Sequence, residues 1–158
     1  MLKWIQGALV LCVLAIAPAA HAGLIVEGSL GKGVKVGPSP VKAEQTNLMI
    51  APGVTVPFLR LELGLVFDTP DIKDSKSNLE LRPMVVISPP LFPLYGRAVF
   101  AVTNLVNGKT TVAYGGALGL SLGVGPIGVF AEAGLLPRSR ASEVNWVIEG
   151  RVGAYVEF

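Results

Sequence analysis

The stretch NWVIEGRVGAYVEF, residues 145–158, alternates with a period of two along its whole length. One face carries only apolar or small side chains, and every charged side chain is on the other. The first set is Trp146, Ile148, Gly150, Val152, Ala154, Val156 and Phe158, and the second includes Glu149, Arg151, Tyr155 and Glu157. Because successive side chains of a strand point to opposite faces, the pattern predicts a β-strand with one apolar and one polar face.

The same alternation recurs along the chain. The clearest other case is 58–67, where leucines at odd positions alternate with Arg60 and Glu62. Weaker segments complete the set, and the least regular, 45–52, is apolar on both faces. The eight expected strands are 24–32, 45–52, 58–67, 78–88, 94–104, 110–123, 127–136 and 146–158. Eight strands of about ten residues match the smallest common transmembrane barrel, so an all-β, antiparallel, up-and-down barrel is predicted.

Overall composition leads to the same fold. Half of the residues are hydrophobic (51%), and the mean hydropathy is +0.60. The longest uncharged run, 110–131, has the length of a membrane helix but contains six glycines and Pro126. Glycine and proline disfavour a helix there. A closed β-barrel is the other structure that satisfies the backbone in lipid.

The first 22 residues have the pattern of a secretory signal peptide. Lys3 gives a basic start, 7–18 is apolar, and Ala20 and Ala22 form an A-x-A cleavage site. Cys12 lies within the apolar run without the small residue that a lipidation site needs just before it. We therefore expect 1–22 to be removed and 23–158 to form one barrel domain.

Several kinds of chemistry are excluded or disfavoured. The only His and Cys, His21 and Cys12, lie in the predicted signal peptide, so 23–158 has no imidazole or thiol for catalysis or zinc binding. We expect no enzyme activity, no cofactor and no metal site. The spacing of Gly123, Gly125 and Gly128 matches a dinucleotide fingerprint, but no βαβ unit surrounds it. With 12 Lys and Arg against 11 Asp and Glu after Lys3 is removed, nucleic-acid binding is not expected.

The final residues also resemble a known signal. Arg151, Gly153, Val156 and Phe158 occupy the defining positions of the C-terminal assembly signal of bacterial outer-membrane β-barrels. With the leader and the eight alternating segments, the whole chain resembles the small eight-stranded class that includes OmpA and OmpX. The resemblance implies an outer-membrane location in a Gram-negative envelope, surrounding lipids and the barrel assembly machinery as partners. It leaves the oligomeric state open.

The connections between strands divide into two kinds. With both ends of the barrel domain on the periplasmic side, the outer connections are 33–44, 68–77, 105–109 and 137–144, most of them strongly polar. The inner ones are compact turns at 52–53, 88–90 and 123–126. This asymmetry is typical of outer-membrane barrels. Asp68, Asp71 and Asp74 could hold Ca²⁺ through oxygen ligands, but a solvated loop accounts for them more simply.

The polar faces predict a charged barrel interior, since eight strands leave room only for side chains. Avoiding like-charge pairs predicts that Glu62 faces Arg82 and that Glu132 faces Arg151. On the outside, Phe67, Tyr114 and Trp146 are expected at the outer rim and Phe158 at the inner rim. The predicted interior charges are Glu27, Arg60, Glu62, Glu80, Arg82, Arg97, Glu132, Glu149 and Arg151, and Glu157 is expected to point inward with them.

Three functions fit this pattern. The first is a non-enzymatic outer-membrane protein with a structural or surface-contact role. The second is a narrow channel for ions or small solutes, lined by the interior charges. The third is a soluble exported barrel that carries an apolar ligand; its apolar face would point inward. Alternation alone does not determine which face is inside, but the terminal signal and the leucine-rich faces favour the membrane protein.

Overall fold

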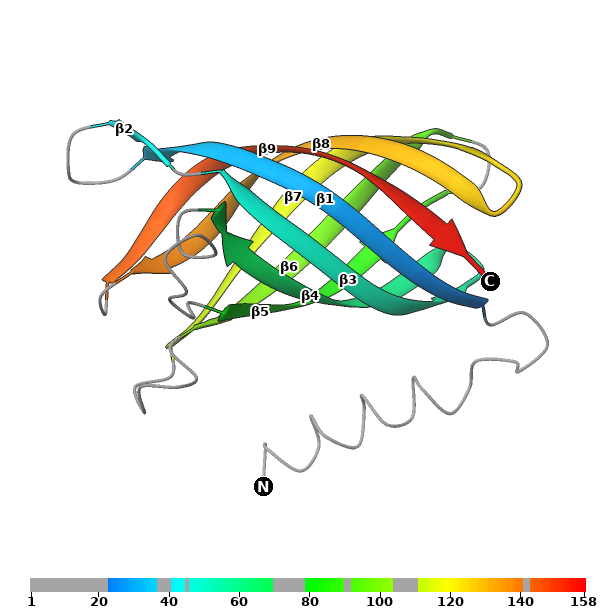
Figure 1. The fold of residues 1–158 in the computed structure, drawn as a ribbon, viewed down its shortest axis with the longest axis horizontal. Helices are drawn as coiled ribbons and strands as arrows, with labels where there is room; N and C mark the ends of the chain where they lie inside the picture. Colours follow the sequence, from blue (N-terminus) through cyan, green and yellow to red (C-terminus); the bar gives the residue numbers. More distant parts are fainter. Residues whose placement is uncertain are drawn as a thin grey trace, which may run out of the picture.

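The computed structural model describes residues 23–36, 41–44, 46–69, 79–89, 92–103, 111–140 and 143–158, and the predicted signal peptide lies outside them. They form eight long strands and the two-residue strand β2 (Figure 1). The strands are β1 Gly23–Val36, β2 Lys42–Ala43, β3 Asn47–Val56, β4 Leu59–Asp68, β5 Leu79–Ile87, β6 Leu94–Thr103, β7 Thr111–Val124, β8 Ile127–Arg140 and β9 Glu143–Glu157. Among these residues, no helix has the length and apolarity to cross a membrane.

The eight long strands close into a barrel. Each pairs antiparallel with the next long strand in the chain, and β9 pairs back onto β1 from Ile25↔Glu157 to Val36↔Trp146. Leu24 and Phe158 complete the seam through reciprocal backbone hydrogen bonds of 3.0 and 2.8 Å. The predicted eight-stranded, antiparallel, up-and-down barrel is confirmed.

One predicted turn is wrong. Pro52 and Gly53 lie inside β3, and the chain turns instead at Pro57 and Phe58, where Phe58 has φ +69°. The β1–β3 ladder runs unbroken past Pro52, while the β3–β4 ladder lacks the pairs between Ile50↔Leu65 and Gly53↔Glu62. The side of Pro52 that lacks an N–H therefore faces β4. The unbroken pairing with β1 keeps this segment in the sheet.

Two predicted outer connections are also mostly strand. β1 runs to Val36 and pairs with β2, so much of 33–44 is a hairpin. β8 runs to Arg140 and β9 begins at Glu143, which leaves only 141–142 as the connection. The alternation of apolar and polar residues fades in these segments, and their polar composition resembles that of a loop.

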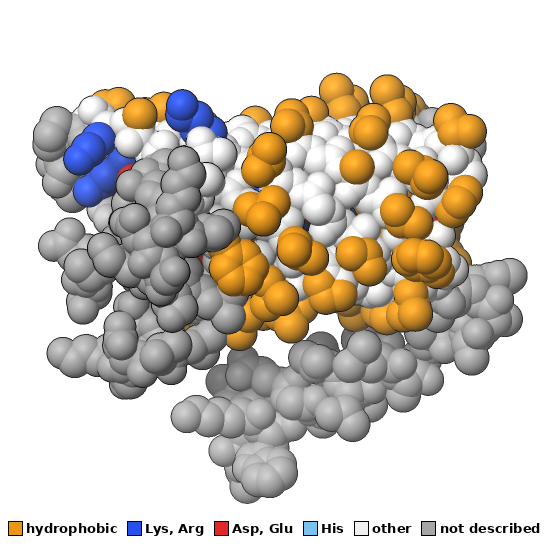
Figure 2. Space-filling model, in the orientation of Figure 1, with side chains coloured by type: hydrophobic (Ala, Val, Ile, Leu, Met, Phe, Trp, Pro, Cys, Tyr) orange, Lys and Arg blue, Asp and Glu red, His pale blue; other side chains and the backbone are white. Residues whose placement is uncertain are grey.

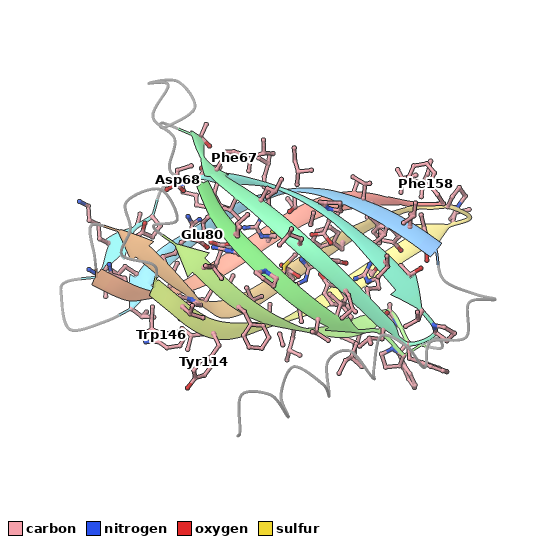
Figure 3. All side chains as sticks on the ribbon, turned by 90° about the horizontal axis from the view of Figure 1, so that it is seen from below. Phe67, Asp68, Glu80, Tyr114, Trp146 and Phe158 are labelled. Atoms are coloured by element: carbon pink, nitrogen blue, oxygen red, sulfur yellow. The ribbon has the colours of Figure 1, made fainter. Side chains whose placement is uncertain are left out.

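The barrel is apolar outside and charged inside. Figure 2 shows hydrophobic side chains spread over the outer wall, and Leu24, Leu118 and Val152 are 60–73% exposed. Interior charged side chains such as Glu27 and Glu149 are at most 1% exposed. Figure 3 places Phe67, Tyr114 and Trp146 toward one end of the barrel and Phe158 at the other, as predicted.

Glycines on the inner wall make room for aromatic rings. A Cβ on Gly119 would lie 2.4 Å from the ring of Tyr95, and one on Gly128 would lie 2.2 Å from the ring of Tyr155. Tyr95 packs edge-on against Phe130 with ring centroids 6.3 Å apart. These rings fill the end of the barrel near the short turns, and a second apolar cluster adds to the core. That cluster is Met49, Ala51, Val66, Met84, Val99 and Leu136.

Candidate functional site: the charged interior

The barrel interior gathers the charges that the sequence assigned to it. All nine predicted residues point inward; Arg60 has a side-chain exposure of 12%, and the others are at most 8% exposed. They come from six strands. Every second residue of a strand points inward, and the closed sheet brings these inward side chains together. Glu157 lies at the rim, where it accepts a 2.7 Å hydrogen bond from the hydroxyl of Thr55.

Glu149 on β9 is the centre of one cluster. Its carboxylate contacts three guanidinium groups: Arg151 at 2.5 Å, Arg138 at 3.1 Å and Arg82 at 3.3 Å. The amide of Asn47 also donates to Glu149, at 3.2 Å. One acid therefore joins β9 to β3, β5 and β8, and these charge-assisted bonds bridge the barrel cavity.

Two further acids balance these arginines. Glu80 lies 2.5 Å from Nε of Arg82, and Asp68 lies 2.9 Å from Nη1 of Arg138. Arg151 makes two more bonds, to the hydroxyl of Ser29 at 3.0 Å and to the side-chain oxygen of Asn47. We call this set, with Glu149, the Glu149 network; it lies nearer the end of the barrel that carries β2.

Arg97 on β6 is the centre of the second cluster. It forms a bidentate pair with Glu27 at 2.6 and 3.0 Å, and its Nε lies 3.1 Å from Glu132. Tyr95 donates a 2.7 Å hydrogen bond to the same Glu132. Glu62 lies 3.6 Å from Arg97 and 3.4 Å from Arg60.

Aromatic rings enclose this Arg97 network. The guanidinium of Arg97 lies 5.5 Å from the ring centroid of Phe130, and that of Arg60 lies 5.5 Å from the centroid of Tyr155. Cation–π contacts of this kind let the arginine charge rest against apolar surface. A long contact of 3.8 Å between Arg151 and Glu132 connects the two networks.

Sequence reasoning missed five interior polar residues, one of which is Thr55 on β3, beside Glu157. Asp68 and Arg138 were placed in outer connections, but Asp68 continues the inward face of β4 and Arg138 that of β8. Asn47 and Tyr95 were not singled out. The signal was present in the sequence, because Asp68 and Arg138 each follow an inward glutamate, Glu62 or Glu132, by six positions.

One of the two predicted cross-strand pairs is correct. Glu132 lies directly opposite Arg151, as expected. Glu62 lies opposite Met84, and Arg82 lies opposite Gly64, so the predicted Glu62–Arg82 pair is wrong by two positions. The like-charge pair of Glu62 with Glu80 is avoided all the same, and Arg82 reaches Glu80 along its own strand.

The described interior side chains pair charges with one another. Within the described residues no cluster of His, Cys, Asp or Glu is arranged to hold a metal ion. Asp68 contacts Arg138, while Asp71 and Asp74 lie outside the described residues. The glycine-rich stretch that matched a dinucleotide fingerprint is the β7–β8 hairpin, with Gly125 at φ +60° in its turn.

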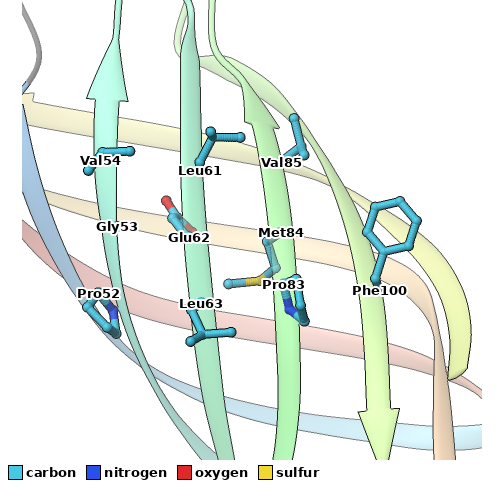
Figure 4. Close-up of a pocket in the computed structure, with 10 residues that line it drawn as sticks. All are labelled: Pro52, Gly53, Val54, Leu61, Glu62, Leu63, Pro83, Met84, Val85 and Phe100. Carbon is cyan, nitrogen blue, oxygen red and sulfur yellow. The ribbon is translucent and has the colours of Figure 1, made fainter. Parts of the chain in front are cut away.

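A shallow groove lies on the outer wall where the ladders are interrupted. Pro83 in β5 leaves a gap in its ladder with β6, as Pro52 does in its ladder with β4. The groove has a volume of about 600 Å³ and an apolar lining that includes Val54, Leu63 and Phe100 (Figure 4). Glu62 lies behind it on the inner side of β4.

The residues of the predicted assembly signal divide between the two faces. Arg151 points inward, and Gly153 faces Phe130, whose ring a Cβ at that position would approach to 2.6 Å. Val156 and Phe158 point outward, with Phe158 75% exposed. The spacing of the motif thus follows the alternation of β9.

The fold and interior define a class: a closed eight-stranded antiparallel barrel with an apolar wall and a charged core, the fold of small outer-membrane barrels. The crystal structure of Neisserial surface protein A is similar, with a TM-score of 0.59 and 16% sequence identity over 85% of this chain and 97% of that one. No protein-family model matches the chain, and no curated protein matches its sequence.

Proposed function

We propose that this chain is an integral outer-membrane protein with a structural or surface-contact role and no catalytic activity. The supporting observation is the apolar outer wall, which surrounds a closed barrel whose backbone groups pair within the sheet. Surrounding lipids are its immediate partners, and their acyl chains would fill the groove at Pro52 and Pro83. The terminal signal makes the barrel assembly machinery its second partner.

The soluble carrier is disfavoured by the direction of the side chains. A soluble barrel with an apolar ligand needs apolar residues inside and charges in water. Here the charges of Arg82, Arg97 and Glu149 are buried, and the leucines of β7 are exposed. An exposed apolar surface that encircles a barrel is expected where lipid covers it.

A sealed barrel is favoured over a channel. Arg82 and Arg97 extend across the interior and are at most 3% exposed. Ions would have to break pairs such as Arg97–Glu27 in order to pass. We expect no conductance from inserted protein in a planar bilayer, at low or high salt. Stable steps that change in size with Arg97→Gln would make the channel the correct function.

Membrane topology can be tested by cysteine labelling in whole cells. The chain has a single cysteine, Cys12, so Cys12→Ala gives a cysteine-free background. A maleimide reagent that is too large to pass through porins, and so cannot reach the periplasm, should label Lys42→Cys on intact cells. It should label Pro57→Cys only after the outer membrane is permeabilised, because the β3–β4 turn that contains Pro57 lies at the end of the barrel opposite β2.

A lipid-facing position provides the control for this experiment. Leu61→Cys on β4 should react in neither case and should become reactive only after unfolding. Equal labelling of Lys42→Cys and Pro57→Cys in intact cells would refute the proposed topology. Reaction of Leu61→Cys in folded protein would refute the assignment of the outer wall to lipid.

A further inference from the structure

Lysines and arginines are strictly separated in the described part of the chain. The five arginines with described side chains, Arg60, Arg82, Arg97, Arg138 and Arg151, all belong to the interior networks. The three described lysines, Lys32, Lys35 and Lys42, all lie on the hairpin formed by the end of β1 and by β2. We call this hairpin, residues 32–36 and 41–44, the lysine hairpin.

The lysine hairpin lies at the edge of the apolar wall. In Figure 2 the blue Lys and Arg side chains appear at one end of the molecule, beyond the orange band. Lys32 shares its face of β1 with the exposed Leu30 and Val34, so its aliphatic stem follows the lipid-facing wall. Such lysines extend the ammonium group toward the polar layer of a bilayer.

Register places two of these lysines in an unfavourable pair. Lys35 and Lys42 lie directly opposite each other in the β1–β2 ladder, where like charges destabilise a sheet. Glu44 is the one carboxylate among the described residues of the hairpin, so these residues carry a net charge of +2. The hairpin therefore concentrates positive charge that an external anion would neutralise.

The surroundings indicate the kind of anion. Trp146 on β9 lies opposite Val36 and is 38% exposed, and tryptophan prefers the boundary between acyl chains and headgroups. At the other end of the barrel, the described rim presents Glu157 and Phe158, and the nearby Arg60 points into the barrel. Among the described residues, the exposed positive charge is thus confined to one end of the barrel.

We propose that the lysine hairpin binds the phosphate groups of anionic lipids in the leaflet that surrounds this end of the barrel. Lysine suits this role as a point charge that can contact a phosphate from several directions. The inference rests on the proposed membrane location and adds to it a preferred lipid class at a named site.

Trp146 provides a reporter for this binding. The chain has two tryptophans, Trp4 and Trp146, so Trp4→Phe leaves only the one beside the hairpin. The full chain carrying Trp4→Phe is purified from membranes and reconstituted in phosphatidylcholine vesicles. Quenching of Trp146 is then compared between brominated phosphatidic acid and brominated phosphatidylcholine at equal mole fraction.

We expect phosphatidic acid to associate more tightly than phosphatidylcholine. Each lysine near an anionic surface contributes a factor of about five at low salt, so a preference of about tenfold or more is expected. High salt should reduce it. Joint replacement of Lys32, Lys35 and Lys42 by glutamine should abolish the preference, and replacement by arginine should retain it.

A matched control removes the same charge from two other predicted outer connections, 68–77 and 105–109. Lys73→Gln, Lys76→Gln and Lys109→Gln together should leave the preference intact. Its loss in this control, its survival without the hairpin lysines, or equal quenching by both lipids would overturn the inference. If neither lipid quenches Trp146, the membrane location itself fails, which distinguishes the two proposals.

Discussion

Replacing Glu149 with glutamine removes the carboxylate that contacts Arg82, Arg138 and Arg151. Opposite charges about 4 Å apart attract by roughly 4 kcal/mol each at an effective dielectric constant of about 20. The variant loses three such attractions and leaves an excess positive charge in the Glu149 network. Glutamine keeps part of the hydrogen bonding and avoids burying a carboxylate, which offsets several kcal/mol. We expect the free energy of unfolding to fall by about 3–5 kcal/mol.

The assay is urea unfolding in phosphatidylcholine vesicles, followed by the fluorescence of Trp146 in the Trp4→Phe background. Adding Arg151→Gln removes the excess charge, so the double variant should lose less stability than the sum of the two single variants. A loss below about 1 kcal/mol for Glu149→Gln would refute the reasoning. It would mean that water screens these charges, and the channel function would then be favoured.

Three further changes test the wall, the core and a turn. Leu118→Arg on the exposed face of β7 should lower the free energy of unfolding in vesicles by about 2–4 kcal/mol. Val124→Arg at the end of the same strand should lower it by only about 0–1 kcal/mol. Equal and negligible losses for both variants would contradict a lipid-facing wall. Gly128→Ala should cost about 1–3 kcal/mol because the added methyl overlaps an aromatic ring, whereas Gly150→Ala, which has open space, should stay within about 0.5. Phe58→Asn should raise the unfolding free energy in detergent micelles by about 1 kcal/mol, since asparagine tolerates the positive φ better; no gain would show that the turn is unstrained.

The sequence predicted the fold wherever one face of a strand is apolar and exposed and the other lines the charged interior. In 58–67 the leucines and the charged residues alternate without exception up to Gly64, and β4 begins and ends within one residue of that range. At the outer end both faces can be polar. The last residues of β1 and β8 therefore show no alternation of apolar and polar side chains, although they are strand.

Which residues an interior charge pairs with was harder to predict than whether its side chain points inward. A side chain's face follows from its own strand, but its partners depend on register, which the turns set. Placing the β3–β4 turn at Pro52 rather than Pro57 leaves the faces of β4 unchanged but shifts its pairing with β3. The wrong Glu62–Arg82 pair lies in the other ladder of β4, whose register depends on the connection to β5. Long side chains add contacts across the cavity, such as Arg97 to Glu27, that no adjacent-strand pairing predicts.

The interior charges have a second consequence, for the choice of register. Slipping a strand by one residue would turn every inward side chain outward. An arginine that faces lipid costs about 2–4 kcal/mol near the bilayer midplane, so a slip of β5 or β6 exposes a costly charge. A buried ion pair itself is a weak source of stability compared with an apolar pair of similar volume. We therefore expect the networks to contribute more to the free-energy difference between the correct and slipped registers than to the free energy of unfolding.

The pair of Glu80 and Arg82 on β5 separates these two roles. Replacing both, Glu80→Leu with Arg82→Met, removes a buried acid and a buried base together and keeps their volume. The unfolding free energy of correctly folded protein should fall by less than in Glu149→Gln, because one charge of each sign leaves the interior. The fraction that folds to a single species, measured by the mobility of unheated protein in gels, should drop, because β5 then has no charge to keep it from slipping. An unchanged yield of one species would mean that turns and backbone pairing alone fix the register.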